Sequence, residues 1–401
     1  MPPGTATPPL PEDASSGDPA VDLARRLLRC QSVTPADDGA LDVLDAALTP
    51  LGFACEKVVF TEPGTPDVAN LYARWGRGRP RIALAGHSDV VPPGDLAAWS
   101  ADPFDGEIRD GVLIGRGAVD MKGALAAFVA AAAQVLPGRD PGAGAVALLI
   151  TGDEEGPAIN GTRKLRDWLA ERGETPDACI VGEPTSSARV GDTVKVGRRG
   201  SLNAEITVCG RQGHSAYPQH ADNPVHPLVR ALADLVATPL DDGSPDFEPS
   251  TLQVTSVDVG NPASNVIPGR AVARLNIRFN DRHTGAAVES WLRARLAATC
   301  PQAELSVRVS GESFLCPDGP LRAAVAAATQ AVTGAEPTSG TGGGTSDARF
   351  IKDLCPVVEL GLCNATAHQV DEQVPLADLA TLTAIYAAAL ARLLDSAPGP
   401  A

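Results

Sequence analysis

Hydrophobic residues in the first half of the chain form short uninterrupted runs separated by helical segments. Residues 81–86 and 145–151 are continuous apolar runs, and 179–182 is a shorter one. Such runs are typical of strands covered on both faces, as in a parallel sheet. The Ala-rich segment 122–136 between the first two runs stops at a Pro-Gly pair, which predicts a helix. Strand, helix and strand in this order predict an α/β catalytic domain with a central, mostly parallel sheet.

The pattern changes near residue 194, where apolar and polar positions begin to alternate with a period of two. This alternation predicts strands with one buried and one wet face. Four segments show it: 202–208, 252–259, 273–279 and 304–309. Helical stretches around 225–236 and 286–298 separate them, which gives the order strand, helix, strand, strand, helix, strand. This is the order of a ferredoxin-like unit, so we expect 194–311 to be an inserted ferredoxin-like α+β domain.

The flanks of this insertion belong to the first domain. Residues 319–332 and 376–394 are predicted helices, and 356–360 is a short apolar strand. We therefore expect the catalytic domain to comprise 21–193 and 312–401. Residues 1–20 are rich in Pro, Ala and acidic residues and lack a basic segment followed by an apolar one. They predict a disordered tail and argue against a secretory signal.

Composition excludes several classes of partner. The chain has 49 acidic and 33 basic residues and a net charge of −16, which repels nucleic acid and anionic membranes. No apolar run reaches the roughly 18–20 residues that cross a bilayer. The eight cysteines form no C-x-x-C pair, and several lie in apolar runs, where buried, inert thiols are expected. These features favour a cytoplasmic protein.

Histidine and carboxylate residues follow the predicted strands in five segments. The segments are 86–92 with His87 and Asp89, 115–123 with Asp120, 150–156 with Glu154 and Glu155, 181–185 with Glu183, and 364–372 with His368. Because ligands of open α/β sheets collect at the carboxyl ends of strands, we expect these side chains to converge.

Each segment alone also has a plainer interpretation. His87 and Asp89 can form a polar turn, or a metal ligand with the carboxylate that orients its ring. Asp120 can be a helix N-cap. The acids around Glu154 can be a solvated turn, or one can bind metal while its neighbour acts as general base. Taken together, two histidines and three carboxylates suit two Zn²⁺ ions bridged by a carboxylate and a water.

As a set, these segments resemble the M20 family of cocatalytic zinc peptidases and deacylases. The motifs GHSDVVP, GRGAVDMKG, TGDEEG and VGEPTS and the late His368 occur in the family's order and approximate spacing, and the resemblance runs from about residue 21 to 394. Three further segments resemble one group of family members, namely GRRGSLNAEITVCGRQGHSAYP, SNVIPG and GGGTSDARFI. Members of this group hydrolyse N-succinyl-L,L-2,6-diaminopimelate to succinate and L,L-diaminopimelate, in lysine and cell-wall precursor biosynthesis. The resemblance implies that the protein is a metal-dependent amidohydrolase. It also implies a homodimer in which the inserted domain is the dimerisation (lid) domain.

The resemblance also implies the metal ligands. It places one Zn²⁺ on His87 and Glu183 and a second on Glu155 and His368, with Asp120 bridging them, which makes two Zn²⁺ per subunit. Co²⁺ or Mn²⁺ can substitute, because affinity order leaves selectivity to geometry and metal supply.

The remaining roles implied by the resemblance are catalytic and substrate-binding. Asp89 would orient His87, Glu154 would be the general base, and His214 would reach into the partner subunit and stabilise the oxyanion. His220 competes for that last role, but His214 has the QGH setting of the family. The substrate carries three carboxylates and one ammonium, which require Arg forks and hydroxyl or amide donors. The family-like segments offer Arg198, Ser201, Asn265, Arg278 and Thr345.

Two other functions remain open at this point. The chain can be an acetylornithine deacetylase or another M20 aminoacylase or dipeptidase, which succinate release compared with acetate release would distinguish. It can also be a metal-binding protein without turnover. The intact Glu154 argues against that second possibility, because loss of the base is the simplest route to inactivity.

Overall fold

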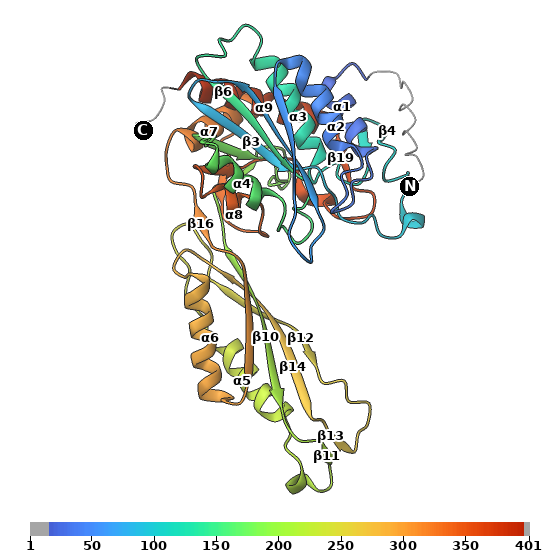
Figure 1. Ribbon diagram of the computed structural model, residues 1–401, viewed down its shortest axis with the longest axis vertical. Coiled ribbons are helices and arrows are strands. Elements are labelled where there is room, and N and C mark those ends of the chain that lie inside the picture. Colours follow the sequence, from blue (N-terminus) through green and yellow to red (C-terminus); the bar gives the residue numbers. More distant parts are fainter. Residues whose placement is uncertain (1–15, 397–401) are drawn as a thin grey trace.

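The computed structural model describes residues 16–396, which form a large α/β domain and an elongated smaller domain (Figure 1). The chain leaves the large domain after β8 (Thr193–Lys195) and re-enters it at β16 (Phe314–Leu315). The outgoing β9 (Gly197–Arg198) pairs with β16, so two antiparallel segments link the domains. The predicted boundary at 194 therefore falls slightly early, because β8 still belongs to the large sheet.

The large sheet is mixed, with a parallel centre. Its strands, in order across the sheet, are β1 (Ala54–Phe60), β2 (Val68–Gly76), β6 (Ala145–Thr151), β3 (Arg81–His87), β7 (Ala178–Val181), β18 (Val357–Glu359), β8 and β17 (Thr338–Gly340). The central four, β6, β3, β7 and β18, are mutually parallel. β1, β2 and β6 are joined in antiparallel fashion, as are β18 and β8. The parallel centre agrees with the prediction.

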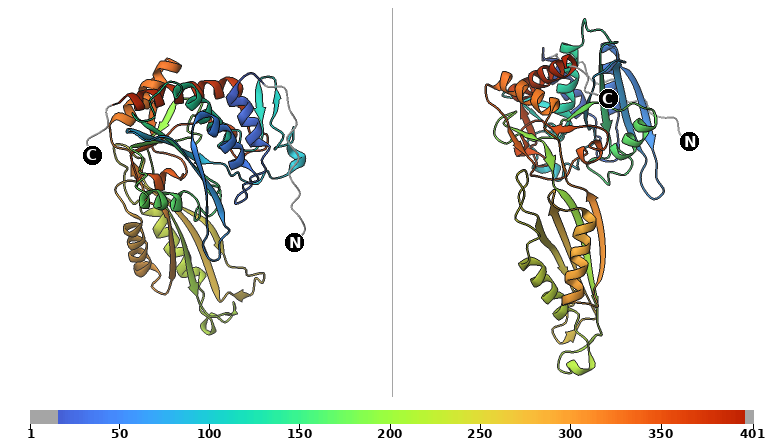
Figure 2. Two further views of the ribbon diagram at one scale, coloured as in Figure 1. Left: turned by 45° about the horizontal axis from the view of Figure 1, so that its top comes forward. Right: turned by 90° about the vertical axis from the view of Figure 1, so that its left-hand side faces the viewer.

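Both faces of this sheet are covered, which explains the uninterrupted apolar runs (Figure 2). Ile82 and Leu84 of β3 face one core, and Ala83 and Ala85 face another. The first core lies under α1 (Pro19–Leu28), α2 (Ala40–Leu48), α3 (Lys122–Val135), α7 (Pro320–Thr333) and α9 (Leu376–Asp395), and the second under α4 (Thr162–Glu171) and α8 (Ala348–Ile351). A small sheet of β4 (Glu107–Arg109), β5 (Val112–Ile114) and β19 (Gln373–Pro375) lies beside them.

Helix α9 has the length and composition of a membrane span, a property that the sequence analysis did not assign to it. In the structure α9 packs against α3 and α7. Leu382, Tyr386 and Leu390 are fully buried in the core that these helices share. Its apolar residues are therefore accounted for by the packing of the domain.

The inserted domain is a four-stranded antiparallel sheet with two helices. The strand order is β12 (Thr251–Asp258), β14 (Arg270–Phe279), β10 (Gly200–Cys209), β15 (Glu304–Gly311). Helices α5 (Val225–Ala237) and α6 (Gly285–Thr299) share a core with one face of this sheet. Alternate residues such as Leu202 and Ile206 enter that core, while Asn203 and Glu205 do not. The order of elements matches the ferredoxin-like prediction.

The far end of the inserted domain, its tip, is made of β11 (Gly213–His214), β13 (Val266–Ile267) and the turn η3 (Pro218–His220) (Figure 1). At the other end of the molecule, the predicted tail needs a correction. Residues 1–15 lie outside the described residues, but Pro19 and Ala20 already form the first turn of α1. Asp18 caps this helix by accepting the N–H groups of Ala20 and Val21, and proline suits the first helical turn.

Candidate metal centre

The predicted ligands meet at one edge of the large sheet, where the parallel strands end. His87 is the last residue of β3, Glu155 follows β6, and Glu183 follows β7. Asp120 precedes the N-cap residue of α3, Met121, and His368 lies in the loop between β18 and β19. The convergence follows from topology, because parallel neighbours present their carboxyl ends on the same side.

Asp120 lies between the two histidines. Its Oδ1 is 3.1 Å from His87 Nε2, and its Oδ2 is 3.3 Å from His368 Nε2. Glu155 Oε1 lies 2.8 Å from His368 Nε2, and Glu183 Oε1 lies 3.8 Å from His87 Nε2. Each imidazole therefore has one carboxylate neighbour of its own, Glu183 for His87 and Glu155 for His368. Both imidazoles also lie beside Asp120, which is the geometry of a bridging ligand.

Asp89 supports this cluster in a different way from the one predicted. The backbone carbonyl of Asp89 lies 2.9 Å from His87 Nδ1, closer than its carboxylate Oδ1 at 3.6 Å. A proton on Nδ1 leaves the lone pair of Nε2 free to bind metal. The Asp89 carboxylate accepts the backbone N–H groups of Glu154 and Glu155, at 3.3 and 3.1 Å. Asp89 thus connects the strand end that carries His87 to the turn that carries the two glutamates.

The electrostatics of the cluster favour binding of a cation. Burial, and then the charge of Glu183, raises the pKa of Glu154 well above its ordinary value, and burial beside Asp120 does the same for Glu183. Although burial alone would lower it, the hydrogen bond to Asp120 and the nearby carboxylates hold the pKa of His87 well above 6.5. These carboxylates repel one another, and a bound proton or metal ion would relieve that repulsion.

The donors at this edge fit a metal ion. His87, Asp120 and Glu155 bring ligand atoms within 4.8 Å of one another, and so do His87, Glu154 and Glu183. Glu183 Oε1 is buried and has no hydrogen-bond partner, an arrangement that is costly unless a cation occupies the site. Imidazole nitrogens and carboxylate oxygens are ligands that Zn²⁺ accepts.

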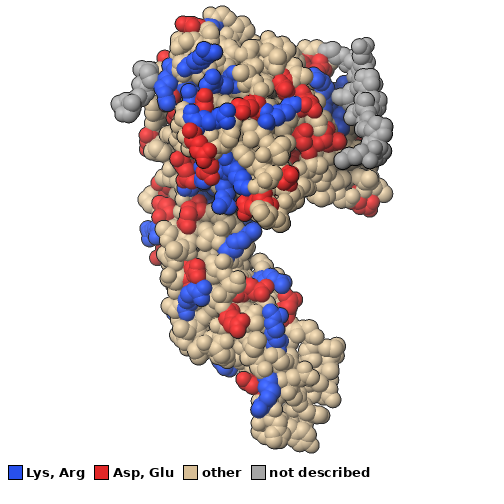
Figure 3. All heavy atoms as spheres, in the orientation of Figure 1, with Lys and Arg blue, Asp and Glu red and all other residues tan. Residues whose placement is uncertain are grey.

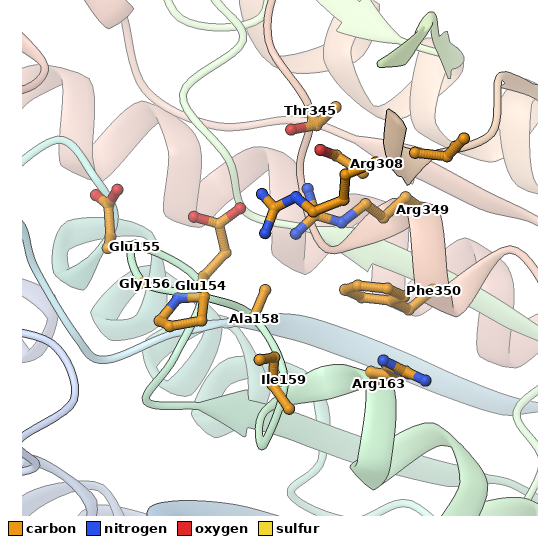
Figure 4. Close-up of a pocket in the computed structure, with 13 residues that line it drawn as sticks. Glu154, Glu155, Gly156, Ala158, Ile159, Arg163, Arg308, Thr345, Arg349 and Phe350 are labelled. Atoms are coloured by element: carbon orange, nitrogen blue, oxygen red, sulfur yellow. The ribbon is translucent and has the colours of Figure 1, made fainter. Parts of the chain in front are cut away.

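A cavity of about 730 Å³ adjoins the cluster, between the large domain and the inserted one. Glu154 points into it toward Arg308 of β15 and Arg349 of α8 (Figure 4), and Thr345 also lines it. On the face shown in Figure 3, basic side chains gather where the two domains meet. Thr345 is among the predicted substrate contacts, whereas Arg308 and Arg349 are not. An arginine inside the GGGTSDARF segment was the available signal for Arg349.

Two arginines, Arg349 and Arg278, each have a buried N–H group without a partner. Nε of Arg349 and Nη1 of Arg278 are buried without a hydrogen-bond partner. Burial, and then the charges of Arg199 and Arg349, lowers the pKa of Arg278. Ser201 lies directly opposite Arg278 in the β10–β14 pairing, and both lie near the end of the inserted sheet that adjoins the large domain. Guanidinium groups gathered in this way favour a ligand with several carboxylates.

Arg198 has a different environment from the other predicted substrate contacts. It is buried, its Nε lies 2.9 Å from Glu359 Oε2, and its Nη2 pairs with the same carboxylate. Its Nη1 donates to the Gly344 carbonyl at 3.0 Å, beside Thr345. Ser346 also donates to Glu359, at 2.5 Å. The charge of Arg198 is therefore already paired, and its contact with Gly344 connects it to the loop that carries Thr345.

His214 and Asn265 lie together at the tip of the inserted domain. His214 pairs with Val266 across β11 and β13, and the Asn265 carbonyl accepts the N–H of Ser215 at 2.9 Å. Tyr217 packs edge-on against the His214 ring and is 56% exposed. The tip is at the opposite end of the inserted domain from the metal ligands of the same chain (Figure 1). The structure therefore separates these two residues from the metal ligands of their own chain, and the prediction for His214 concerns the site of a partner subunit.

Comparison with known proteins identifies the group to which the chain is related. Residues 83–392 match Peptidase family M20/M25/M40. A succinyl-diaminopimelate desuccinylase of Rhodospirillum centenum is 59% identical over 92% of this chain and 96% of its own length. A protein of the same name from Gluconacetobacter diazotrophicus is 57% identical over 94% of this chain and 97% of its own. These matches confirm the predicted family resemblance.

Solved structures agree with the fold. An M20 family metallo-carboxypeptidase from Sulfolobus solfataricus superposes with a TM-score of 0.74 at 17% identity, covering 94% of this chain and 99% of its own. The aminopeptidase PepT of Bacillus cereus gives 0.74 at 20% identity, with coverage of 94% and 98%. A dinuclear metal-binding M20 peptidase of Bacillus subtilis gives 0.68 at 17% identity, with coverage of 94% and 96%.

Proposed function

The chain belongs to Peptidase family M20/M25/M40, and we propose that it hydrolyses N-succinyl-L,L-2,6-diaminopimelate to succinate and L,L-diaminopimelate with two Zn²⁺ per subunit. The observation that carries the proposal is the position of Glu154, between a carboxylate–imidazole cluster and an arginine-lined cavity. Relatives that are 57–59% identical along nearly their whole length bear the name of this activity. The cavity chemistry supports the same substrate, which carries three carboxylates.

The proposed ligand assignment follows the contacts. His87 and Glu183 would hold one ion, Glu155 and His368 the other, and Asp120 would bridge them. When bound, the ions would supply a Lewis acid for the amide oxygen and make water acidic enough to attack near neutral pH.

Glu154 moves the protons in this scheme. A carboxylate within reach of the attacking water accepts a proton from it as the oxygen bonds to the carbonyl carbon. The C–N bond then breaks, and Glu154 delivers that proton to the departing amine nitrogen. The products are succinate and an amine, and the carboxylate is regenerated.

Substrate carboxylates would contact the cavity arginines. Arg349 and Arg278 are proposed as charge partners because each has a buried N–H without an acceptor. Ser201 and Thr345 are proposed as hydroxyl donors next to them. Arg198 enters the proposal as the residue that holds the Thr345 loop, since Glu359 already pairs with it.

A homodimer would complete the site. We propose that the tip carries His214 and Asn265 into the site of a second copy, where the His214 imidazole stabilises the oxyanion. The distance of the tip from the metal ligands of its own chain supports this arrangement. The tip also presents few charged side chains on the face shown in Figure 3, which suits contact with another subunit. All eight cysteines are free, in keeping with the predicted cytoplasmic location.

An activity panel tests the proposal. The protein is assayed with N-succinyl-L,L-diaminopimelate and with N-acetylornithine, with and without added Zn²⁺, by following succinate and acetate release. We expect zinc-dependent succinate release to be much the faster reaction. Faster turnover of acetylornithine would replace the substrate assignment and leave the metal site intact. Zinc-independent succinate release would overturn the mechanism.

A further inference from the structure

A buried ion pair adjoins the proposed metal ligands and has no part in the mechanism above. Arg116 and Glu372 are 2% and 0% exposed, and Arg116 Nη1 donates to Glu372 Oε2 at 2.7 Å. Burying two charges is expensive, and an apolar pair of similar volume often stabilises a fold at least as well. Stability alone therefore does not explain the pair, and its other contacts become informative.

The pair contacts the backbones of two metal ligands. Glu372 Oε1 accepts the N–H groups of Val119 and Asp120, at 2.9 and 3.0 Å. Arg116 Nη2 donates to the carbonyl oxygen of His368 at 3.4 Å. One ion pair thus connects the segment that carries the shared carboxylate to the loop that carries the second histidine. The pairing of β5 with β19 joins the same two segments a few residues away.

His368 needs such support more than His87 does. The His87 side chain is 1% exposed and the His368 side chain is 48% exposed, so packing restrains the first ring much more than the second. The backbone of His368 also has φ of +62°, and Asp371 in the same loop has φ of +57°. Non-glycine residues in this region persist only when their surroundings restrain them. Contacts to the His368 backbone therefore set where its ring lies.

We propose that Arg116 and Glu372 are positioning residues that fix His368 relative to Asp120 and thereby set the affinity for one of the two metal ions. The ion assigned to Glu155 and His368 is affected most, because the pair holds both His368 and Asp120, whereas the ion assigned to His87 and Glu183 depends on the pair through Asp120 alone. This inference rests on the proposed two-metal function. Groups that orient metal ligands typically contribute about 10–100-fold to metal affinity.

The test measures zinc binding to metal-free protein by competition with a chromophoric chelator. In Glu372→Gln, the amide can still accept the backbone N–H groups, but its NH₂ group faces the Arg116 donors. We expect one of the two zinc-binding steps to weaken roughly 10–100-fold and the other to change much less. The variant His368→Ala identifies the affected step, because it removes a ligand of that ion alone.

Two further variants separate positioning from general stability. Glu174→Gln makes the same chemical change in an acid that pairs with Arg74, near Arg81 at the opposite end of β3, and should leave both zinc steps unchanged. The double variant Arg116→Met with Glu372→Leu removes both buried charges together, so no unpaired charge is left to unfold the protein. Because Val119 and Asp120 lose the acceptor of their backbone N–H groups, its metal-free melting temperature should fall by a few degrees. We expect the same zinc step to stay weak and the other step to change much less.

The outcomes are distinct. If the double variant binds both ions like the wild type, or if both steps weaken in parallel with a lower metal-free melting temperature, the positioning role is overturned. If the wild-type protein itself does not bind two ions, the proposed two-metal function fails, and the loss does not arise from the ion pair.

Discussion

The metal-binding edge of the large domain and the tip of the inserted domain differ in how complete they are within one chain. At the edge, His87 pairs with Asp120 and His368 pairs with Glu155, and the Asp89 carboxylate accepts the backbone N–H of Glu155. At the tip, His214 and Tyr217 contact mainly each other and solvent. Buried ligand side chains that converge form a site within one chain, whereas an exposed histidine takes part in a site only when another molecule binds next to it. The two regions therefore make different demands on experiment.

The largest effect should come from the complete region. Glu154→Gln keeps the size of the side chain and removes the proton acceptor, so we expect kcat to fall roughly 10²–10⁴-fold. Succinate release measures the loss. Metal analysis should still find two zinc ions per chain, because Glu154 is not an assigned ligand. Turnover near the wild-type rate would show that another group is the base.

The next effect tests whether the tip acts in a second subunit. His214→Ala should lower kcat about 10²–10³-fold, as expected for loss of one oxyanion donor. Mixing this variant with Glu154→Gln under conditions that exchange subunits should restore about a quarter of the wild-type activity, because half of the dimers would contain one intact site.

The control for that mixture is each variant exchanged with itself, which should stay inactive. A mixture that regains nothing, although subunit exchange is demonstrated by labelled chains, would mean that His214 does not act across subunits. The tip would then not contribute to the site of a second subunit.

A smaller effect concerns the cavity between the two regions. Arg349→Met removes a guanidinium whose Nε lacks a partner, so we expect kcat/KM for the succinylated substrate to fall about 10–100-fold, mainly through KM. Arg293→Met, at an exposed arginine paired with Glu289 on α6, is the matched control and should have no effect. An unchanged KM in Arg349→Met would remove this arginine from the proposed carboxylate site.

The smallest effect is a pH dependence of metal stabilisation. In the metal-free protein, burial raises the pKa values of Glu154 and Glu183, and the hydrogen bonds to Asp120 and Glu155 raise that of His368 to about 10. A raised pKa means that the folded state binds protons more tightly, so the free energy of unfolding falls as pH rises between about 5 and 8. The lowered pKa of Asp120 has no influence there, because this carboxyl is ionised in both states.

Zinc replaces the protons that the cluster would otherwise retain. The rise in melting temperature produced by saturating zinc should therefore be several degrees larger near pH 8 than near pH 5.5. Scanning calorimetry with and without zinc measures this difference, and excess chelator should reverse it. A zinc effect that is equal or smaller near pH 8 would mean that the donors are not protonated in the metal-free fold.

Much of the architecture was predictable because burial leaves a direct trace in the sequence. The runs at 81–86 and 145–151 are uninterrupted because both faces of β3 and β6 are covered. The alternation around Leu202 and Ile206 reflects a sheet with one face against helices. β1 left a weaker trace, since its residues are mostly exposed or half-buried.

The sequence by itself determined which candidate ligands converge at one edge of the sheet, and the tertiary structure decided what each one contacts. His87, Glu155 and Glu183 were recognisable because acids and histidines directly after buried strands must share one edge of a parallel sheet. Three features could not be recognised from the sequence. They are the pairing of Arg198 with Glu359, the separation of His214 from the metal ligands of its own chain, and the contact of Glu372 with Asp120. The physical reason is that these contacts join segments far apart in the chain, and sequence spacing records only the local periodicity of burial.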